Sequence, residues 1–200
     1  MTSPAFDALL EQARAAHRDT ADIARFCPFP TDLRSSSFTA FHIKSADLMA
    51  ADPVMNAPDA HPLARAFIAA GPQAQWRETY KNTMIGDDFM DRFACYCLIG
   101  QGGPWISDQM AGFVVYMPPG LHYTWHHHPA EELYYVLAGQ AEFLREGADS
   151  KVLHTGDSSF HASNQPHAME THDHPVMAYV IWRNHLGTPP VLTERTVDRP

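Results

Sequence analysis

The sequence predicts a mainly β protein in which α-helices precede a β-sandwich or barrel. Up to about residue 82, apolar residues recur at helical spacing in segments that Pro and Gly separate. From about Phe93, the apolar runs are short and are separated by turn residues such as Gly and Asp, which is typical of closely spaced strands. We therefore expect residues 1–90 to form a helical segment that packs on a barrel of residues 91–200 and is not an independent domain.

The helical segment is expected to begin at Ser3 and Pro4, which are residue types favoured at the N-cap and the first helical position. An amphipathic pattern with Phe6 and Leu9 then continues to about Phe26, where two prolines interrupt it. Shorter helices are predicted at about 46–51, 61–70 and 73–82. No catalytic motif is recognised in this part of the chain.

The second part of the chain contains a series of strand-like runs. They are FACYCLIGQ, AGFVVYMP, HYTWHHH, ELYYVLAGQAEFLREG, SKVLHTGD, SSFHAS, HAMETH and VMAYVIWRNH. Within LAGQAEF, the residues around Gly139 are expected to form the turn of a hairpin. Cys95 and Cys97 fall on one face of their strand and are expected to pack as small apolar groups. The final residues are expected to form an extended tail.

The composition argues against several classes of partner. The formal net charge is -9, and no run of Lys and Arg indicates a nucleic-acid surface. No apolar segment approaches the roughly 20 residues that a membrane span needs. The N-terminal residues do not resemble a secretory signal, and the 3 cysteines lack disulfide-framework spacing, so a reducing cytoplasm is the expected compartment. Exposed strands and an apolar helical face are compatible with a homodimer.

Histidine is the unusual component of this sequence. The chain has 13 histidines, and many of them lie between His122 and His167. Side chains alternate between the two faces of a strand, so His126 and His128 share one face and His127 takes the other. Glu132 and Tyr134 share a face of the following strand and can meet the two histidines if the chain turns between them.

A further histidine, His167, lies in another strand-like stretch, NQPHAMETH. Together with His126, His128 and Glu132 it would give three imidazoles and one carboxylate. This donor set suits one divalent ion of Zn, Fe, Mn, Co or Ni, and residue identity does not choose among these metals.

The spacing of these residues resembles the signature of the cupin superfamily. The pattern G-x5-H-x-H-x3-E-x6-G runs without a gap from Gly120 to Gly139. A second pattern, G-x5-P-x-G-x2-H, is matched from Gly156 to His167, with Ala162 and Asn164 where the family usually has Pro and Gly. The resemblance implies a cupin double-stranded β-helix, a jelly-roll-like barrel, with a metal ion bound inside it.

A narrower resemblance is to the bacterial cupin-type dimethylsulfoniopropionate (DMSP) lyases, the DddQ-like group. It rests on HHHPAEELYYVLAGQAEF, the preceding HYTW, the later aromatic-rich YVIWRNH, and a plan of about 200 residues with helices before the barrel. This resemblance implies a carbon–sulfur lyase that converts DMSP to dimethyl sulfide and acrylate by β-elimination. The family's catalytic base is the Tyr two residues after the metal-binding Glu, which corresponds to Tyr134.

The sulfonium group of such a substrate would be bound by aromatic faces through cation–π contacts. The resemblance favours Tyr123 and Trp182, although strict alternation from His126 places Tyr123 on the opposite face unless a bulge intervenes. The remaining candidates for substrate contact are Trp125, Phe160, His122 and Tyr179. Packing or surface roles are open alternatives for these four, and His161 is likewise open between substrate orientation and packing.

Two other functions remain open at this point, because the cupin fold supports many activities. One is an Fe(II) cupin dioxygenase that acts on a small organic acid or thiol. The other is a non-enzymatic cupin that binds a small ligand. Oxygen consumption would separate the dioxygenase from the lyase, which needs no electron acceptor.

Overall fold

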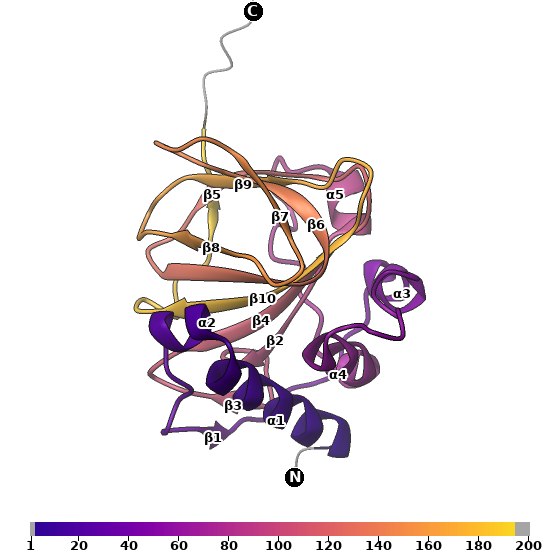
Figure 1. Cartoon of the computed structure of the whole chain (residues 1–200), viewed down its shortest axis with the longest axis vertical. Helices are drawn as coiled ribbons and strands as arrows, with labels where there is room; N and C mark the ends of the chain where they lie inside the picture. Colours follow the sequence, from indigo (N-terminus) through magenta and orange to yellow (C-terminus); the bar gives the residue numbers. More distant parts are fainter. Residues whose placement is uncertain (1–2, 195–200) are drawn as a thin grey trace, which may run out of the picture.

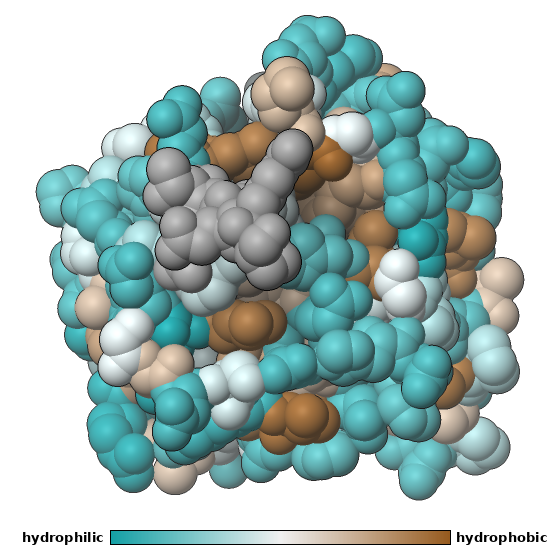
Figure 2. All heavy atoms as spheres, turned by 90° about the horizontal axis from the view of Figure 1, so that it is seen from above, coloured by the Kyte–Doolittle hydropathy of each residue, from teal (hydrophilic) through white to brown (hydrophobic). Residues whose placement is uncertain are grey.

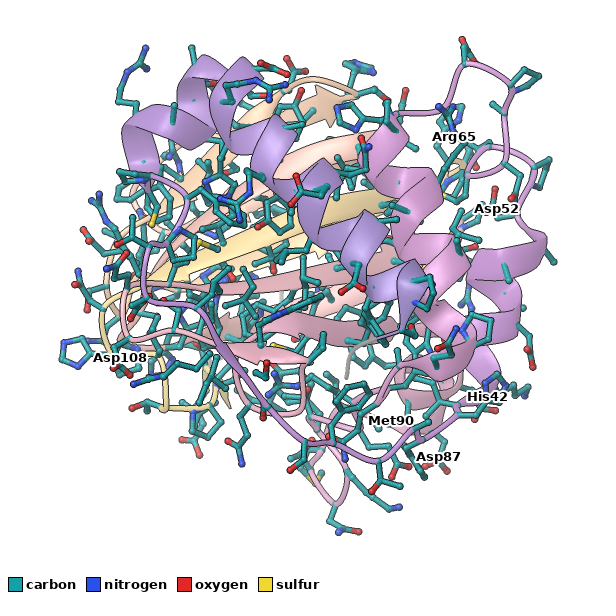
Figure 3. The ribbon with its side chains drawn as sticks, turned by 90° about the horizontal axis from the view of Figure 1, so that it is seen from below. His42, Asp52, Arg65, Asp87, Met90 and Asp108 are labelled. Carbon is teal, nitrogen blue, oxygen red and sulfur yellow. The ribbon has the colours of Figure 1, made fainter. Side chains whose placement is uncertain are left out.

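The computed structural model describes residues 3–194, in which helices from the first part of the chain cover one face of a β structure made of two sheets (Figure 1). The helices are α1 (Pro4–Asp19), α2 (Ala21–Phe26), α3 (Lys44–Ala51), α4 (Pro62–Ala70) and α5 (Asp87–Arg92), with a short 3-10 helix at Gly71–Gln73. Seen from below, the helices cross the strands of one sheet (Figure 3). The predicted arrangement of helices before a mainly β structure is confirmed.

Two helix predictions need correction. The first helix does not continue to Phe26, because Thr20 has an extended backbone and separates α1 from α2. The helix predicted over 73–82 is wrong. Instead, the Trp76 N–H donates to the Phe41 carbonyl, and the Arg77 N–H donates to the Cys95 carbonyl. These bonds hold the segment in an extended form beside the first long strand, where a helix would leave both carbonyls without their donors.

The eleven strands described are β1 (Arg34–Ser35), β2 (Ala94–Ile99), β3 (Trp105–Ile106), β4 (Ala111–Met117), β5 (His122–His127), β6 (Glu131–Arg145), β7 (Lys151–His154), β8 (Ser158–His161), β9 (His167–Glu170), β10 (Val176–Arg183) and β11 (Val191–Leu192). One sheet has the order β1-β3-β2-β4-β10-β6, and β8 also pairs with this half of β6. The other sheet contains the second half of β6 with β7, β9, β5 and β11.

Strand β6 is shared by both sheets, and this corrects the predicted hairpin at Gly139. The chain does not reverse there; it continues as one strand with a positive φ of 74° at Gly139. The backbone passes so close to Pro175 that a Cβ atom at Gly139 would overlap the Pro175 carbonyl oxygen. The glycine therefore permits a bend and a close approach within a strand, a role that is also common for glycine.

Alternation along the strands creates two separate apolar cores. On β2, Cys95 and Cys97 face the space between the two sheets, whereas Tyr96 packs among residues of the helices. On β10, Trp182 faces the space between the sheets and Tyr179 faces the helices. The core between the sheets surrounds the histidine cluster, and the core under the helices supports the back of the same strands.

The surface seen from above is mainly hydrophilic, and hydrophobic side chains reach it in separate places (Figure 2). Among residues 3–194, none of the helices has both the length and the apolar character that crossing a membrane requires. The homodimer expected from the sequence stays a prediction.

Candidate metal centre

A bulge in β5 determines which side chains of this strand enter the space between the sheets. The pairing of β5 with β9 shifts between Tyr123 and His126, so that both side chains become buried on the same side. The Tyr123 ring stacks on the His126 ring with centroids 3.9 Å apart. The bulge that the sequence analysis required for Tyr123 to reach the site is therefore present, and His127 points to the other face, where its Nδ1 lies 2.8 Å from Thr193 Oγ1.

Three buried histidines have their ring orientation fixed by backbone carbonyls. The Nδ1 atoms of His126, His128 and His167 lie 2.9, 3.0 and 2.8 Å from the carbonyl oxygens of Thr124, Ala130 and Gln165. A carbonyl can only accept, so each Nδ1–H must donate, and in the neutral ring the lone pair is then on Nε2. This is the tautomer that a histidine bound to a metal through Nε2 requires.

The Nε2 atoms of His128 and His167 converge on the carboxylate of Glu132. They lie 3.4 Å from Glu132 Oε1 and 3.1 Å from Glu132 Oε2, and one ligand atom from each of the three residues falls within 4.8 Å of the others. Both Nε2 atoms are buried, and although each lies within ion-pair distance of Glu132, neither makes a hydrogen bond within residues 3–194. Buried polar atoms rarely remain unpaired, so these two nitrogens fit a bound divalent ion.

His126 adjoins this group without joining it. Its ring centroid lies 4.1 Å from that of His167 but 6.3 Å from that of His128. Burial, together with the charge that His167 carries when protonated, lowers the pKa of His126 well below its ordinary value. His126 is therefore a neutral imidazole at neutral pH.

Opposing effects act on the charge of Glu132. Burial favours the neutral acid, but the nearby imidazoles of His128 and His167 outweigh burial and hold the pKa of Glu132 well below its usual range. For His128, too, burial opposes the charged form and the attraction of Glu132 outweighs it. Because the charged form of an imidazole is the protonated one, the pKa of His128 lies above its ordinary value. Glu132 is thus a carboxylate at neutral pH, as a metal ligand must be.

Two other side chains fix the orientation of the Glu132 carboxylate. The Trp182 indole N–H donates to Oε1 over 2.6 Å, and the His161 Nδ1–H donates to Oε2 over 2.9 Å. Burial lowers the pKa of His161 to about 4, so this ring is neutral and donates through Nδ1 while Nε2 contacts Ser159 Oγ at 3.0 Å. His161, which the sequence left open between two roles, thus contacts the predicted ligand directly.

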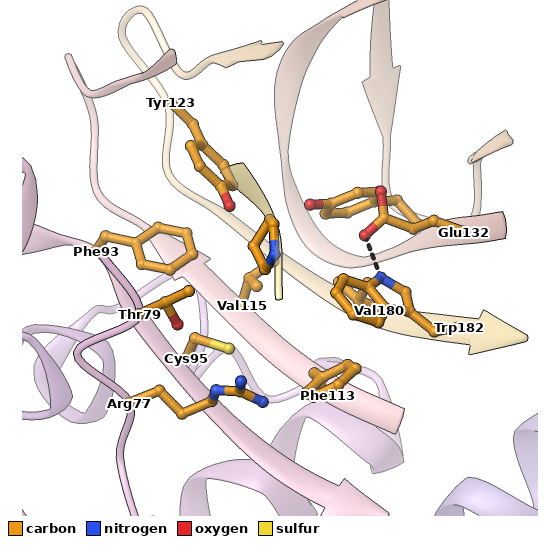
Figure 4. A pocket seen from close by; sticks show the side chains of 12 residues that line it. Arg77, Thr79, Phe93, Cys95, Phe113, Val115, Tyr123, Glu132, Val180 and Trp182 are labelled. Carbon is orange, nitrogen blue, oxygen red and sulfur yellow. Dashed lines mark hydrogen bonds between the residues drawn. The ribbon is translucent and has the colours of Figure 1, made fainter. Parts of the chain in front are cut away.

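A small cavity of about 40 Å³ adjoins Glu132 (Figure 4). Its wall includes Tyr134, Tyr123 and Trp182 together with apolar side chains from β2 and β4. Tyr134 is only 3% exposed, and its ring centroid lies 5.4 Å from that of His161. Burial and the Glu132 charge raise the pKa of Tyr134 well above its usual value. Tyr135, one residue further, packs under the helices instead.

The structure does not bring four other candidates for substrate contact to this cavity. Phe160 lies on the outer face of β8, is 38% exposed and contacts Phe26 with ring centroids 5.9 Å apart. Tyr179 faces the helices, where its hydroxyl lies 3.2 Å from His17 Nε2.

The other two of these candidates belong to β5. His122 is exposed beside Glu170, at an Nδ1 to Oε2 distance of 2.8 Å, because it precedes the bulge that reverses the alternation of the strand. Trp125 is half-buried within the bulge and does not line the cavity.

The second cupin-like pattern departs from the usual sequence at a position that the structure explains. Asn164, in place of Gly, has a positive φ of 57°, and its N–H donates to the His128 carbonyl over 2.8 Å. Asparagine tolerates this left-handed conformation better than other non-glycine residues. The turn before His167 therefore keeps its geometry despite the substitution.

Sequence reasoning missed the contribution of the segment from residue 76 to residue 80. Arg77 and Thr79 line the cavity, and the Tyr80 hydroxyl lies 2.7 Å from the Tyr123 hydroxyl. This segment was expected to be helical and without chemistry. Its residues have no strand-like periodicity, so no local signal in the sequence places them against β2 and β5.

Comparison with known proteins identifies the family. The profile described as dimethylsulfoniopropionate lyase matches residues 45–178. The chain is 51% identical over 192 residues to the dimethylsulfoniopropionate lyase DddQ of Ruegeria pomeroyi, covering 96% of each protein.

Solved structures agree with this assignment. The crystal structure of that R. pomeroyi enzyme has a TM-score of 0.93 and covers 96% of this chain and 98% of its own. A crystal structure from the pair of DMSP lyases RdDddP and RnDddQII is 36% identical in sequence and has a TM-score of 0.89. The match covers 95% of this chain and 98% of the chain in that structure. The cupin fold predicted from the two histidine patterns is confirmed, and this chain belongs to the dimethylsulfoniopropionate lyase family.

Proposed function

We propose that this chain is a metal-dependent DMSP lyase that releases dimethyl sulfide and acrylate by β-elimination. The observation that carries the proposal is the pair of buried Nε2 atoms of His128 and His167, which converge on the Glu132 carboxylate without a hydrogen bond within residues 3–194, with Tyr134 in the wall of the adjoining cavity. Membership of the family supports the same reaction.

In the proposed site, His128, Glu132 and His167 hold the ion, and His126 is the fourth candidate ligand. The donor set of imidazole nitrogens and one carboxylate suits Zn, Fe, Mn, Co or Ni. A divalent ion held there would act as a Lewis acid toward the substrate carboxylate, and its positive charge would favour the phenolate form of Tyr134.

Tyr134 is proposed to remove the proton from the carbon next to the substrate carboxylate. The electron pair of that C–H bond forms the new carbon–carbon double bond, while the carbon–sulfur bond breaks and its electrons leave with the sulfur. The products are neutral dimethyl sulfide, acrylate and a protonated Tyr134. The proton then passes to solvent before the next turnover.

The sulfonium end of the substrate is proposed to contact the rings of Tyr123 and Trp182. Both rings line the cavity, and both are held in place: the Tyr123 hydroxyl lies 2.7 Å from the Tyr80 hydroxyl, and the Trp182 indole donates to Glu132. Cation–π contacts of this kind contribute about 0.5–2 kcal/mol, depending on desolvation. A rigid aromatic wall would bind the cation without an additional carboxylate, whose negative charge would disfavour the phenolate form of Tyr134.

The proposal is tested by measuring dimethyl sulfide in the headspace over the purified protein supplied with DMSP. Release of dimethyl sulfide is expected without any electron acceptor. It should stop after treatment with a chelator and return when a divalent ion is added. Oxygen uptake recorded in the same vessel provides the control. Oxygen uptake that matches turnover would favour the dioxygenase alternative, and unchanged sulfide release after complete demetallation would refute the proposal.

A further inference from the structure

Arg77 lies in the wall of the site, in a segment whose position is fixed by the neighbouring strand. Its backbone N–H donates to the Cys95 carbonyl of β2 over 2.9 Å. Its guanidinium carbon lies 5.1 Å from the centre of the Phe113 ring on β4. In Figure 4 the Arg77 side chain lies beside Cys95 and extends toward Phe113. The positive charge is therefore held at a defined place by two strands.

This place is the boundary between two cavities. The inner cavity, of about 40 Å³, contains Glu132 in its wall, and an outer cavity of about 260 Å³ is lined partly by the loop around Gly187. Arg77, Phe113 and Trp182 belong to the walls of both cavities. The two cavities therefore adjoin at these three side chains, which form the part of the wall that they share.

The charge of Arg77 is not neutralised by any residue from 3 to 194. Although its side chain is half-buried, its guanidinium forms no ion pair or hydrogen bond with any residue in the part of the chain that the structure describes. Phe113 can hold the guanidinium through a cation–π contact but leaves its N–H donors unsatisfied. The chain carries a net charge of -9, and Glu132 contributes a buried carboxylate nearby, so an isolated cation at this boundary is conspicuous.

We propose that Arg77 is a carboxylate-binding residue at the entrance of the site, which holds the carboxylate of a short-chain acid as it passes between the outer and inner cavities. Guanidinium donors match a carboxylate in geometry and charge. The inference rests on the proposed function in one respect, because the proposed substrate and one proposed product are both short carboxylates. Without Arg77, such an anion would approach Glu132 along walls that contain no other basic side chain among residues 3–194.

The test measures the binding of propionate, a saturated three-carbon carboxylate, by isothermal titration calorimetry, with a chelator present and again with added Zn²⁺. In Arg77→Gln and Arg77→Met, the Kd of propionate is expected to rise by about tenfold or more with the chelator present, as expected for the loss of a charged hydrogen bond. The rise should be smaller with Zn²⁺, because an ion in the proposed site also binds the carboxylate. Arg77→Lys keeps the charge and should recover part of the affinity. Uncharged propionamide should bind equally weakly to all of these proteins.

The matched control is Arg14→Gln. Arg14 also stands over a phenylalanine ring, at 4.4 Å from the centre of Phe29, but it is exposed on α1 far along the chain from the cavity residues. Its Kd for propionate should equal that of the unaltered protein. A propionate Kd in the two uncharged Arg77 variants within about twofold of the unaltered value would overturn the inference; Arg77→Met preserves the aliphatic contact with Phe113 should Arg77→Gln fold poorly.

The inference and the proposed function can fail separately. If the protein releases no dimethyl sulfide but propionate binding still depends on Arg77, the proposed function fails and the carboxylate site stands. If the protein is an active lyase and the Arg77 variants keep both the propionate Kd and the KM for DMSP, the carboxylate site fails alone. A rise in KM with little change in kcat is the expected kinetic result, since Arg77 is not placed at the reacting atoms.

Discussion

At the scale of single residues, the Glu132 carboxylate is oriented by donors on both of its oxygens. Trp182 donates to Oε1 and His161 donates to Oε2, while His128 and His167 present their Nε2 atoms to the same carboxylate. Mutating a side chain that holds a metal ligand in place typically lowers metal affinity or activity by about 10- to 100-fold. His161 is therefore expected to act on the ion through Glu132.

This role predicts the effect of His161→Gln. Loss of the Nδ1–H donor should release one oxygen of Glu132 and weaken Zn²⁺ binding by about 10- to 100-fold, measured by competition with a chromogenic chelator. The control is His172→Gln, which removes a histidine paired with a carboxylate, Glu142, at the surface over 2.8 Å. Equal Zn²⁺ affinity in the two folded variants would show that His161 does not orient the ligand.

A second prediction at this scale concerns the proposed base. Tyr134→Phe keeps the buried ring and removes only the hydroxyl, so the protein should fold and retain its metal. Dimethyl sulfide release should fall by about 10³-fold, within the range that a positioned general base contributes. Metal content and turnover are measured on the same sample. Turnover near that of the unaltered protein would remove Tyr134 from the mechanism.

Alternation explains which residues the sequence could place and which it could not. It correctly put Glu132 and Tyr134 on one face of a strand and Tyr135 on the other. The same rule argues against Phe160, because its neighbour His161 faces inward and adjacent strand residues face opposite ways. Arg77 could not be found in this way, because its place depends on contacts with distant strands, namely the backbone hydrogen bond to Cys95 and the ring of Phe113.

At the scale of elements, the bend in β6 depends on Gly139. Gly139→Ala should destabilise the protein by at least about 3 kcal/mol, since the new methyl group would overlap the Pro175 carbonyl at a positive φ. Unfolding in urea measures this loss. The control is Gly147→Ala, which has a similar φ of 80° but open space around it and should lose only about 1–2 kcal/mol. Equal losses would exclude the overlap as the cause.

His17 connects helix α1 to two other elements. Its Nδ1–H donates to the Cys27 carbonyl after α2 over 2.9 Å, and its Nε2 accepts from the Tyr179 hydroxyl of β10 over 3.2 Å. Burial lowers the pKa of His17 to about 4 from an ordinary value of 6.5. The unfolded chain therefore binds a proton at His17 at a higher pH than the folded protein does.

The sign of the pH effect follows from this difference. The stability associated with neutral His17 is present above pH 6.5 and decreases as the pH falls toward 4, by about 2 kcal/mol between pH 7 and pH 5. His17→Gln should be less stable at pH 7, yet it should lose about 2 kcal/mol less than the unaltered protein over this interval. Urea unfolding at the two pH values measures both losses; parallel losses would contradict the assignment.

Helices were easier to predict than the segment between them and the barrel. α1 and α4 have strong amphipathic patterns and proline at their first positions, so the start of α1 and both ends of α4 were expected near their observed positions, whereas α1 ends at Asp19 and not near Phe26. The segment after residue 73 contains no proline or glycine that forbids a helix, and only its bonds to Phe41 and Cys95 make it extended. Likewise, Gly139 has the local features of a turn, and its true role depends on the distant Pro175.

At the scale of the whole molecule, the residues of the candidate metal centre come from both sheets. Glu132 comes from the half of β6 that pairs with β10, whereas His167 comes from β9 in the other sheet. An ion bound to both residues would stabilise the folded protein but not the unfolded chain, by about 2.7 kcal/mol at a free concentration 100 times the Kd.

Thermal unfolding with a chelator and with Zn²⁺ tests this coupling. The Tm should rise with Zn²⁺ in the unaltered protein and should not respond in Glu132→Gln, which keeps the size of the side chain but loses its charge. An equal rise in both proteins would place the Zn²⁺ effect elsewhere on the molecule.

Division of the chain into a helical segment of 1–90 and a barrel of 91–200 stays a prediction. Strand β1, which belongs to the first segment, pairs with β3 of the barrel.

The continuous strand β6 also has a consequence for how the molecule comes apart. Because the same 15 residues supply hydrogen bonds to both sheets, neither sheet can open fully without disturbing the other. The amides of this strand should consequently exchange with deuterium only in the rarest, most complete openings. Cleavage of the chain within β6 should disrupt both sheets together, whereas cleavage in the loop after β10 should leave both sheets folded.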